Sequence, residues 1–310
     1  MDRKMLSVLG ALVGVLVIFL LIANVGPMFN ESLKLDETAG LRFVFVGIGL
    51  LIAFGIYWAT KSSPAWEVGT REVVYMAIGA ALYAVLSYLF NGTVFAVPSL
   101  SQVALRPAVA IPMFFGYTFG PAVGFFTGAV GNMFGDAITG FGLSPQWSIG
   151  NGLIGMISGM AMLFVDKKKS MDMVMYISGA IAILGFALYL AYRDTPNMVF
   201  FDVPNNIFGD APISVFAGIS GLIGFGLVLA VRFGFAKNTD IAAAVLWGAL
   251  GNFIGLGFAA ISDIWINGFP PQAALVGEFL PSAGPNLIFA AILVPALVAA
   301  YASFRRQSGR

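Results

Sequence analysis

Ten apolar stretches, separated by short polar segments, follow one another along the chain. A hydrocarbon core about 30 Å thick is crossed by a helix of about 20 apolar residues. The pattern therefore predicts an all-α, polytopic membrane bundle of about ten transmembrane helices. The third to sixth stretches are interrupted by Pro and Gly, which indicates short, tilted or kinked helices. The stretches cover about 5–23, 41–60, 73–90, 102–118, 121–138, 148–165, 172–192, 212–231, 241–262 and 284–304.

The first stretch has two interpretations. Arg3 and Lys4 precede it, as positive residues precede the apolar region of a secretory signal peptide. The stretch is long for a signal peptide, and Ala23-Asn24-Val25 lacks the small-x-small pattern of a cleavage site. We interpret it as a membrane anchor.

Lysine and arginine segregate between the two sides of such a bundle. With ten spans both termini lie on one side, and only Lys34, Arg42, Arg106 and Arg193 fall elsewhere. Because cytoplasmic loops carry an excess of Lys and Arg, we expect both termini in the cytoplasm and the chain in the cell membrane. The residues on the predicted cytoplasmic side are Arg3, Lys4, Lys61, Arg71, Lys167, Lys168, Lys169, Arg232, Lys237, Arg305, Arg306 and Arg310.

Composition narrows the chemistry that the chain can perform. It is 59% hydrophobic and 10% charged, and it contains no His and no Cys. These absences remove thiol nucleophiles, iron–sulfur ligation and the commonest general base near neutral pH. No Gly-Lys dipeptide occurs, so there is no Walker A loop. We therefore expect no enzyme activity and no cofactor, and the net charge of +1 argues against a nucleic-acid partner.

Several polar residues interrupt the apolar stretches near their predicted outer ends. Asn132 and Asp136 are four residues apart, so they share one helix face. A charge at the bilayer centre costs about 2.5–3.5 kcal/mol on insertion scales, so such residues usually face a bundle interior or a wet cavity. We expect a pocket open to the outside, in which Trp147 stacks on a flat ring and amides bond its heteroatoms. The candidate substrate-binding residues are Arg106, Asn132, Asp136, Gln146, Trp147, Asn151, Asn252 and Asn286.

A structural role is the alternative for the same residues. Intramembrane asparagines bond neighbouring helices, at about 0.6 kcal/mol for each hydrogen bond. Arg106 and Asp136 can simply pair with each other. The segments 91–102 and 263–283, rich in Phe, Pro, Gly and Ser, are either lids over a pocket or ordinary connecting loops.

Small residues recur at helical spacing. Gly116, Gly120, Gly124 and Gly128 are spaced by four, which indicates close helix packing. Two Ala-x-x-x-Ala pairs overlap on the third stretch, and they either pack within the chain or receive a partner helix. The alanines are Ala77 with Ala81 and Ala80 with Ala84.

Three motifs together resemble the substrate-specific (S) component of energy-coupling factor (ECF) transporters, in the riboflavin-type branch. They are Ala77-Ile-Gly-Ala-Ala-Leu82, Phe119-Gly-Pro-Ala-Val-Gly-Phe125 leading to Asp136, and Pro145-Gln-Trp-Ser-Ile-Gly-Asn-Gly152. The resemblance covers about 71–169 and 240–306 and implies a six-helix core that captures a flat heterocyclic vitamin, riboflavin-like, from outside. It implies a transmembrane coupling subunit and ATPase subunits as partners, with the four alanines contacting the coupling subunit.

The resemblance also suggests how the chain is divided. Residues 70–169 would hold core helices one to four, and 237–310 core helices five and six with a basic tail. Two segments are additional to the family pattern: a two-helix extension, 1–62, and an inserted helical hairpin, 170–236. These helices would either cover the surface that binds the coupling subunit or bind another partner.

Two other functions are also compatible with the sequence. A standalone secondary transporter or channel would move its substrate without ATP or partner subunits. A scaffold subunit that binds no ligand would tolerate leucine at Asn132 and Asp136 but not at the four alanines.

Overall fold

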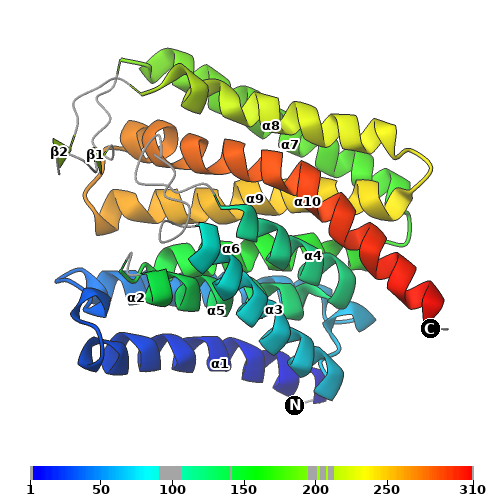
Figure 1. The fold of residues 1–310 in the computed structure, drawn as a ribbon, viewed down its shortest axis with the longest axis horizontal. Coiled ribbons are helices and arrows are strands. Elements are labelled where there is room, and N and C mark those ends of the chain that lie inside the picture. The colour runs from blue at the N-terminus through cyan, green and yellow to red at the C-terminus, as the bar shows by residue number, and fades with distance from the viewer. Residues whose placement is uncertain are drawn as a thin grey trace.

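A computed structural model describes residues 3–90, 106–139, 142–194, 201–202, 207–208 and 213–308. Within these ranges ten α-helices lie roughly along one direction, with both termini at the same end of the bundle (Figure 1). They are α1 (Arg3–Val25), α2 (Ala39–Thr60), α3 (Thr70–Phe90), α4 (Ala110–Phe119), α5 (Pro121–Thr139), α6 (Pro145–Gly159), α7 (Lys167–Tyr192), α8 (Val215–Gly234), α9 (Thr239–Ile266) and α10 (Leu280–Gln307).

Short elements join the helices. A π-helical segment, η6 (Ala273–Phe279), leads directly into α10. The strands β1 (Phe201–Asp202) and β2 (Ile207–Phe208) pair antiparallel between α7 and α8. The 3-10 turns are η1 (Gly26–Met28), η2 (Glu31–Leu33), η3 (Pro64–Trp66), η4 (Pro107–Val109) and η5 (Met160–Leu163).

The predicted all-α membrane bundle is confirmed, and each of the ten apolar stretches contains a helix. Among the described residues, seven helices are long and apolar enough to cross a membrane: α1, α2, α3, α7, α8, α9 and η6 with α10. The third stretch was expected to be short, but α3 has 21 residues. The remaining helices, α4, α5 and α6, have 10, 19 and 15 residues. Most residues of α4 and α5, and nearly all of those of α6, are buried inside the bundle.

Helix α6 lies at the centre of this arrangement, between α5 and α9. α1 packs against α5 and α2 against α6, which places both on one side of the bundle (Figure 1). α7 and α8 pack against α9, and α8 also packs along α10, on the opposite side.

Glycine brings α6 close to both neighbours. A Cβ atom on Gly155 would collide with the backbone of Gly124 on α5, and one on Gly128 would collide with the Asn151 carbonyl. On the other face, a Cβ on Gly150 would lie 2.6 Å from the Gly255 carbonyl oxygen on α9. These positions require glycine because backbones touch there.

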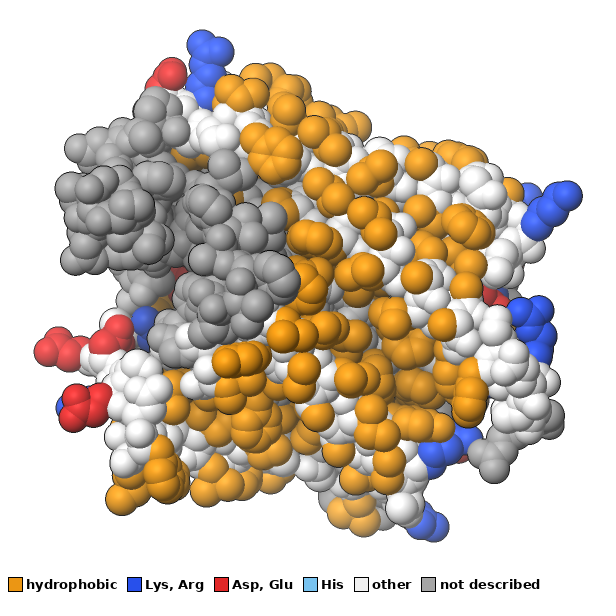
Figure 2. Space-filling model, in the orientation of Figure 1, with side chains coloured by type: hydrophobic (Ala, Val, Ile, Leu, Met, Phe, Trp, Pro, Cys, Tyr) orange, Lys and Arg blue, Asp and Glu red, His pale blue; other side chains and the backbone are white. Residues whose placement is uncertain are grey.

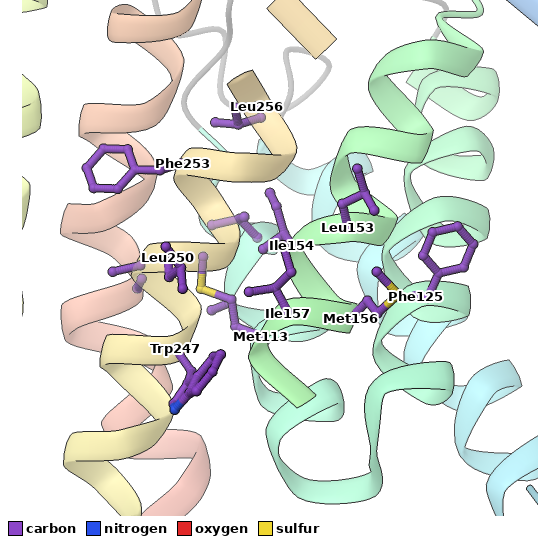
Figure 3. Close-up of a cluster of buried hydrophobic side chains, with 14 of the residues drawn as sticks. Met113, Phe125, Leu153, Ile154, Met156, Ile157, Trp247, Leu250, Phe253 and Leu256 are labelled. Carbon is purple, nitrogen blue, oxygen red and sulfur yellow. The ribbon is translucent and has the colours of Figure 1, made fainter. Parts of the chain in front are cut away.

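Large side chains fill the space around the glycine contacts. Met113 from α4, Phe125 from α5 and Ile154 from α6 are at most 2% exposed. Figure 3 shows side chains from α4, α5 and α6 facing those of α9, where Trp247 and Leu250 are labelled. The apolar core thus continues across α6 from one side of the bundle to the other.

The sequence predicts a lid or a connecting loop at 263–283, but the structure shows that most of this segment is helical. α9 continues through Asp263 to Ile266, and Gly268 then turns the chain with a φ of +67°. Helical structure resumes after Pro270, whose carbonyl accepts from the Ala273 and Ala274 amides. Pro281 stands where the π-helical η6 passes into α10. The other expected lid, 91–102, lies outside the described residues.

Charged side chains gather at the two ends of the bundle. Figure 2 shows a broad apolar surface between one end with most of the visible Lys and Arg and another with most of the visible Asp and Glu. At the end that holds the termini, Lys4 Nζ donates to the Ser63 carbonyl at 3.0 Å, and Arg232 pairs with Asp172 at 3.5 Å. The assignment of this end to the cytoplasm remains a prediction.

Gly155→Ala tests the α5–α6 contact. The added methyl group must push two backbones apart, so we expect the free energy of unfolding to fall by about 1–3 kcal/mol, the usual cost of overpacking. Thermal unfolding of the purified protein in detergent measures the loss. Gly226→Ala is the control, because a Cβ there meets nothing within 4 Å. Equal melting temperatures for the two variants would contradict the close contact.

Candidate functional site

A buried polar network lies between α3, α5 and α6 and centres on Asn132, which is 1% exposed. Its Oδ1 accepts from Arg106 Nη1 at 2.9 Å and from the Tyr83 hydroxyl at 3.1 Å. Its Nδ2 donates to Asp136 Oδ2 at 2.8 Å and to Ser148 Oγ at 3.0 Å. Asn132 on α5 is therefore hydrogen-bonded to α3, to α6 and to Arg106, the residue that precedes η4.

An ion pair closes this first network. Arg106 Nη2 lies 3.7 Å from Asp136 Oδ1, and the two side chains are 19% and 5% exposed. Removing two charges from water is costly unless they pair and form further hydrogen bonds, as both do here through Asn132. The negative charge of Asp136 is thus compensated within the network.

Asn151 extends the network along α6. Its Oδ1 lies 3.0 Å from the Tyr83 hydroxyl, whose single hydrogen is shared between Asn132 and Asn151, and its Nδ2 donates to the Trp147 carbonyl at 3.0 Å. Sequence reasoning missed Tyr83 and Ser148. A tyrosine inside an apolar helix was the available signal for Tyr83, because a buried hydroxyl usually has a hydrogen-bond partner.

A second polar network lies between α6, α9 and η6 and centres on Asp263, which is 1% exposed. Gln146 Nε2 donates to its Oδ1 at 3.1 Å, and the Trp147 indole Nε1 donates to its Oδ2 at 2.7 Å. Glu278 on η6, which packs against α9, is 6% exposed and interacts electrostatically with Asp263. The structure thus separates the α6 residues: Ser148 and Asn151 join α5 and α3, whereas Gln146 and Trp147 join α9.

The last two candidates lie on α9 and α10. Asn252 Nδ2 donates to the Ala283 carbonyl at 2.9 Å, which is the interhelical bond that a structural role predicts. Asn286 is 5% exposed on α10. Of the eight candidates, four therefore belong to the first network and two to the second, while Asn252 joins α9 to α10.

Arg42, which interacts electrostatically with Asp263, lies in a polar rim that it forms with Asp36, Thr38 and Asn267. Arg42 on α2 donates to the Thr38 hydroxyl at 2.9 Å, pairs with Asp36 at 3.3 Å and reaches Asn267 at 3.5 Å. The Thr38 hydroxyl, and secondarily Arg42, hold the pKa of Asp36 below its ordinary value. This rim joins α2 of the N-terminal extension to the end of α9.

Among the described residues, neither a group of metal ligands nor the cavity beside η6 coincides with these networks. In the described ranges no group of three or more Asp, Glu, His or Cys residues could hold a metal ion. A cavity of about 130 Å³ opens beside η6, and its lining contains none of the eight candidates. It is lined by Leu188, Tyr192, Pro271, Gln272, Leu275 and Val276.

Residues 67–195 match the family of the ECF-type riboflavin transporter S component. The resemblance that the motifs predict is confirmed over this segment, which holds the whole of α3 to α7. The match thus includes α7, which the sequence-based division assigned to the inserted hairpin. No solved structure matches the chain.

Several curated proteins that resemble this chain are named UPF0397 proteins. A UPF0397 protein of Vibrio atlanticus is 31% identical over 129 residues, which are 42% of this chain and 65% of the relative. A UPF0397 protein of Aliivibrio salmonicida is 33% identical over 102 residues, 33% of this chain and 54% of the relative. One of Aliivibrio fischeri is 36% identical over 94 residues, 30% of this chain and 49% of the relative. The chain thus spans about half to two thirds of these relatives.

The structure divides the four alanines of α3. Ala80 and Ala84 are 5% and 8% exposed and pack against α5, where the Ala80 carbonyl approaches Gly131. Ala77 and Ala81 are exposed on the opposite side. Only this second pair is accessible to another helix.

A double-mutant cycle on Arg106→Gln and Asp136→Asn tests the ion pair. Each single variant leaves a buried charge uncompensated, so we expect each to lower the free energy of unfolding by about 3 kcal/mol. The double variant should lose less than the sum, with a coupling energy of at least about 1 kcal/mol. Chemical unfolding in mild detergent measures all four proteins.

The matched control is the pair Arg193 and Asp194, 3.9 Å apart with side chains 64% and 93% exposed. The same substitutions there should couple weakly, because water screens exposed pairs. A coupling energy at Arg106 and Asp136 no larger than that of the control would contradict the buried pair.

Proposed function

We propose that this chain is the membrane-embedded substrate-binding (S) subunit of an ECF-type importer. In this proposal it captures a small flat heterocyclic vitamin, riboflavin-like, from outside and delivers it with separate coupling and ATPase subunits. The observation that carries the proposal is the coincidence of the family match with the first polar network: Tyr83, Arg106, Asn132, Asp136 and Asn151 all lie within residues 67–195.

The networks supply what a binding site for a flat polar ring requires. Such sites are mainly apolar, with a few well-placed polar groups that fix orientation. Asn132 and Asn151 offer donors and acceptors on adjacent helices, and both share the Tyr83 hydroxyl. A ligand with ring nitrogens and carbonyl groups would replace these internal bonds with its own. Arg106, Gln146, Trp147, Asn252 and Asn286 complete the proposed lining.

The orientation of the chain supports capture from outside. If the end that holds the termini faces the cytoplasm, as the segregation of Lys and Arg predicts, both networks lie in the outer half of the membrane. The chain would then be a multi-pass protein of the cell membrane with both termini cytoplasmic.

The coupling surface is proposed on α3. Ala77 and Ala81 form an exposed small-residue pair on a helix whose opposite face is buried against α5. Small residues at this spacing let a second helix approach closely within a membrane. Ala80 and Ala84, on the opposite face of α3, would hold the helix in place by packing against α5.

Ligand binding tests the proposed function directly. We expect riboflavin, thiamine or a related vitamin to raise the melting temperature of the purified chain and to quench its Trp fluorescence. A compound at about 100 times its Kd adds about 2.7 kcal/mol to stability. Asn151→Leu should weaken binding at least about tenfold, because a ligand amide or carbonyl loses its partner. Asn24→Leu is the matched control, since Asn24 is exposed on α1. The absence of any response across the series would refute vitamin capture.

Partner binding gives an independent test. The double variant Ala77→Leu and Ala81→Leu should abolish co-purification with an ECF coupling subunit while leaving the melting temperature unchanged, because both positions are exposed. Ala59→Leu, at an exposed position of α2, is the control and should retain the partner. Uptake into vesicles that contain this chain alone, without ATP, would favour a secondary transporter instead.

A further inference from the structure

Two carboxylic acids face each other in the second network, and the structural role of that network does not explain them. Asp263 on α9 is 1% exposed and Glu278 on η6 is 6% exposed. Helix α9 packs against η6, and the two carboxyl groups interact electrostatically. Neighbouring buried carboxylates are not both ionised without a compensating positive charge.

Two buried acceptor atoms at this pair have no hydrogen-bond donor among the described residues. Gln146 and Trp147 already donate to Asp263. In the described part of the chain, no donor reaches Gln146 Oε1 or Glu278 Oε2, although both atoms are buried. Gln146 Oε1 belongs to the same amide group that bonds Asp263. Two acceptors beside a carboxyl pair are thus left for a donor that the described residues do not supply.

The acidic and basic groups of the two networks also favour a positively charged partner for the second network. In the first network Arg106 compensates Asp136. Arg42 interacts electrostatically with Asp263 but is also held by Asp36, Thr38 and Asn267. Among the described residues, Arg42 is therefore shared between Asp263 and Asp36, whereas Arg106 pairs with Asp136.

We propose that Asp263 and Glu278 form a subsite for a positively charged, hydrogen-bond-donating nitrogen group of the captured compound. The compound would be a flat cationic heterocycle or aromatic amidine whose nitrogen hydrogens bond Glu278 Oε2 and Gln146 Oε1. This inference deepens the proposed function and rests on it, because it names the class of substrate.

The neighbouring side chains fit such a compound. The Trp147 indole is held by its bond to Asp263, so its ring is fixed beside the carboxyl pair. Asn151 donates to the Trp147 carbonyl and thereby joins the second network to the first. A ligand that places its cationic nitrogen at the acid pair can place its ring toward the amides of the first network. Cationic groups also bind favourably over an indole face.

Benzamidine and benzamide provide a matched pair of probes, because they share a flat ring and nearly the same shape and differ in charge. We expect benzamidine to raise the melting temperature of the full chain in detergent with an apparent affinity at least tenfold higher than that of benzamide. Glu278→Gln should remove the difference, because it keeps the shape of the side chain and deletes its charge. Glu31→Gln, at an exposed position of η2, should preserve it.

Each outcome decides one of the two proposals. Equal responses to the two probes in the unmodified chain overturn the cation subsite, whether or not Glu278→Gln folds. Asp263→Asn serves as the second variant and should lose selectivity in the same way. If riboflavin or thiamine binds but the probes are not distinguished, vitamin capture stands and the subsite fails. If the probes are distinguished but no vitamin binds, the subsite stands and vitamin capture fails.

Discussion

The close approach of α6 to α5 and α9 is the constraint on which the rest of this structure depends. Lipid is as apolar as leucine, so helices in a membrane associate through backbone proximity and packing rather than through a hydrophobic drive. Gly124 and Gly155 bring α5 and α6 together, while Gly150 and Gly255 bring α6 to α9. Helix α6 consequently has almost no lipid-facing surface, and its polar first turns bond residues on both sides.

This constraint explains what the sequence predicts well. A lipid-facing helix must be apolar over its full length, so the long helices were recognisable from hydropathy. The interior helices were recognisable only as interrupted apolar stretches, because packing rather than length determines where they end. Gly120 illustrates this point: its φ of +111° ends α4, and Pro121 begins α5 immediately afterwards.

The candidate site was predictable in part. Helical spacing places Asn132 and Asp136 on one face, and the structure joins them by a hydrogen bond. Their partners across the bundle were not predictable, since Tyr83 is 49 residues before Asn132 and Asp263 is 117 residues after Gln146. The alanines of α3 show the same limit: alanine suits either a packed or an exposed face, so only tertiary contact separates Ala80 and Ala84 from Ala77 and Ala81.

The two networks differ in where they lie relative to the family match, and this difference bears on substrate choice. The first network belongs wholly to residues 67–195, and its charges are balanced. In the second network Gln146 and Trp147 lie inside that segment, whereas Asp263 and Glu278 lie beyond it on α9 and η6. The matched segment therefore supplies one wall of the second network, and the acidic groups come from the remaining chain. In the proposed subsite, selectivity for charge would therefore depend on α9 and η6, which lie outside the matched segment.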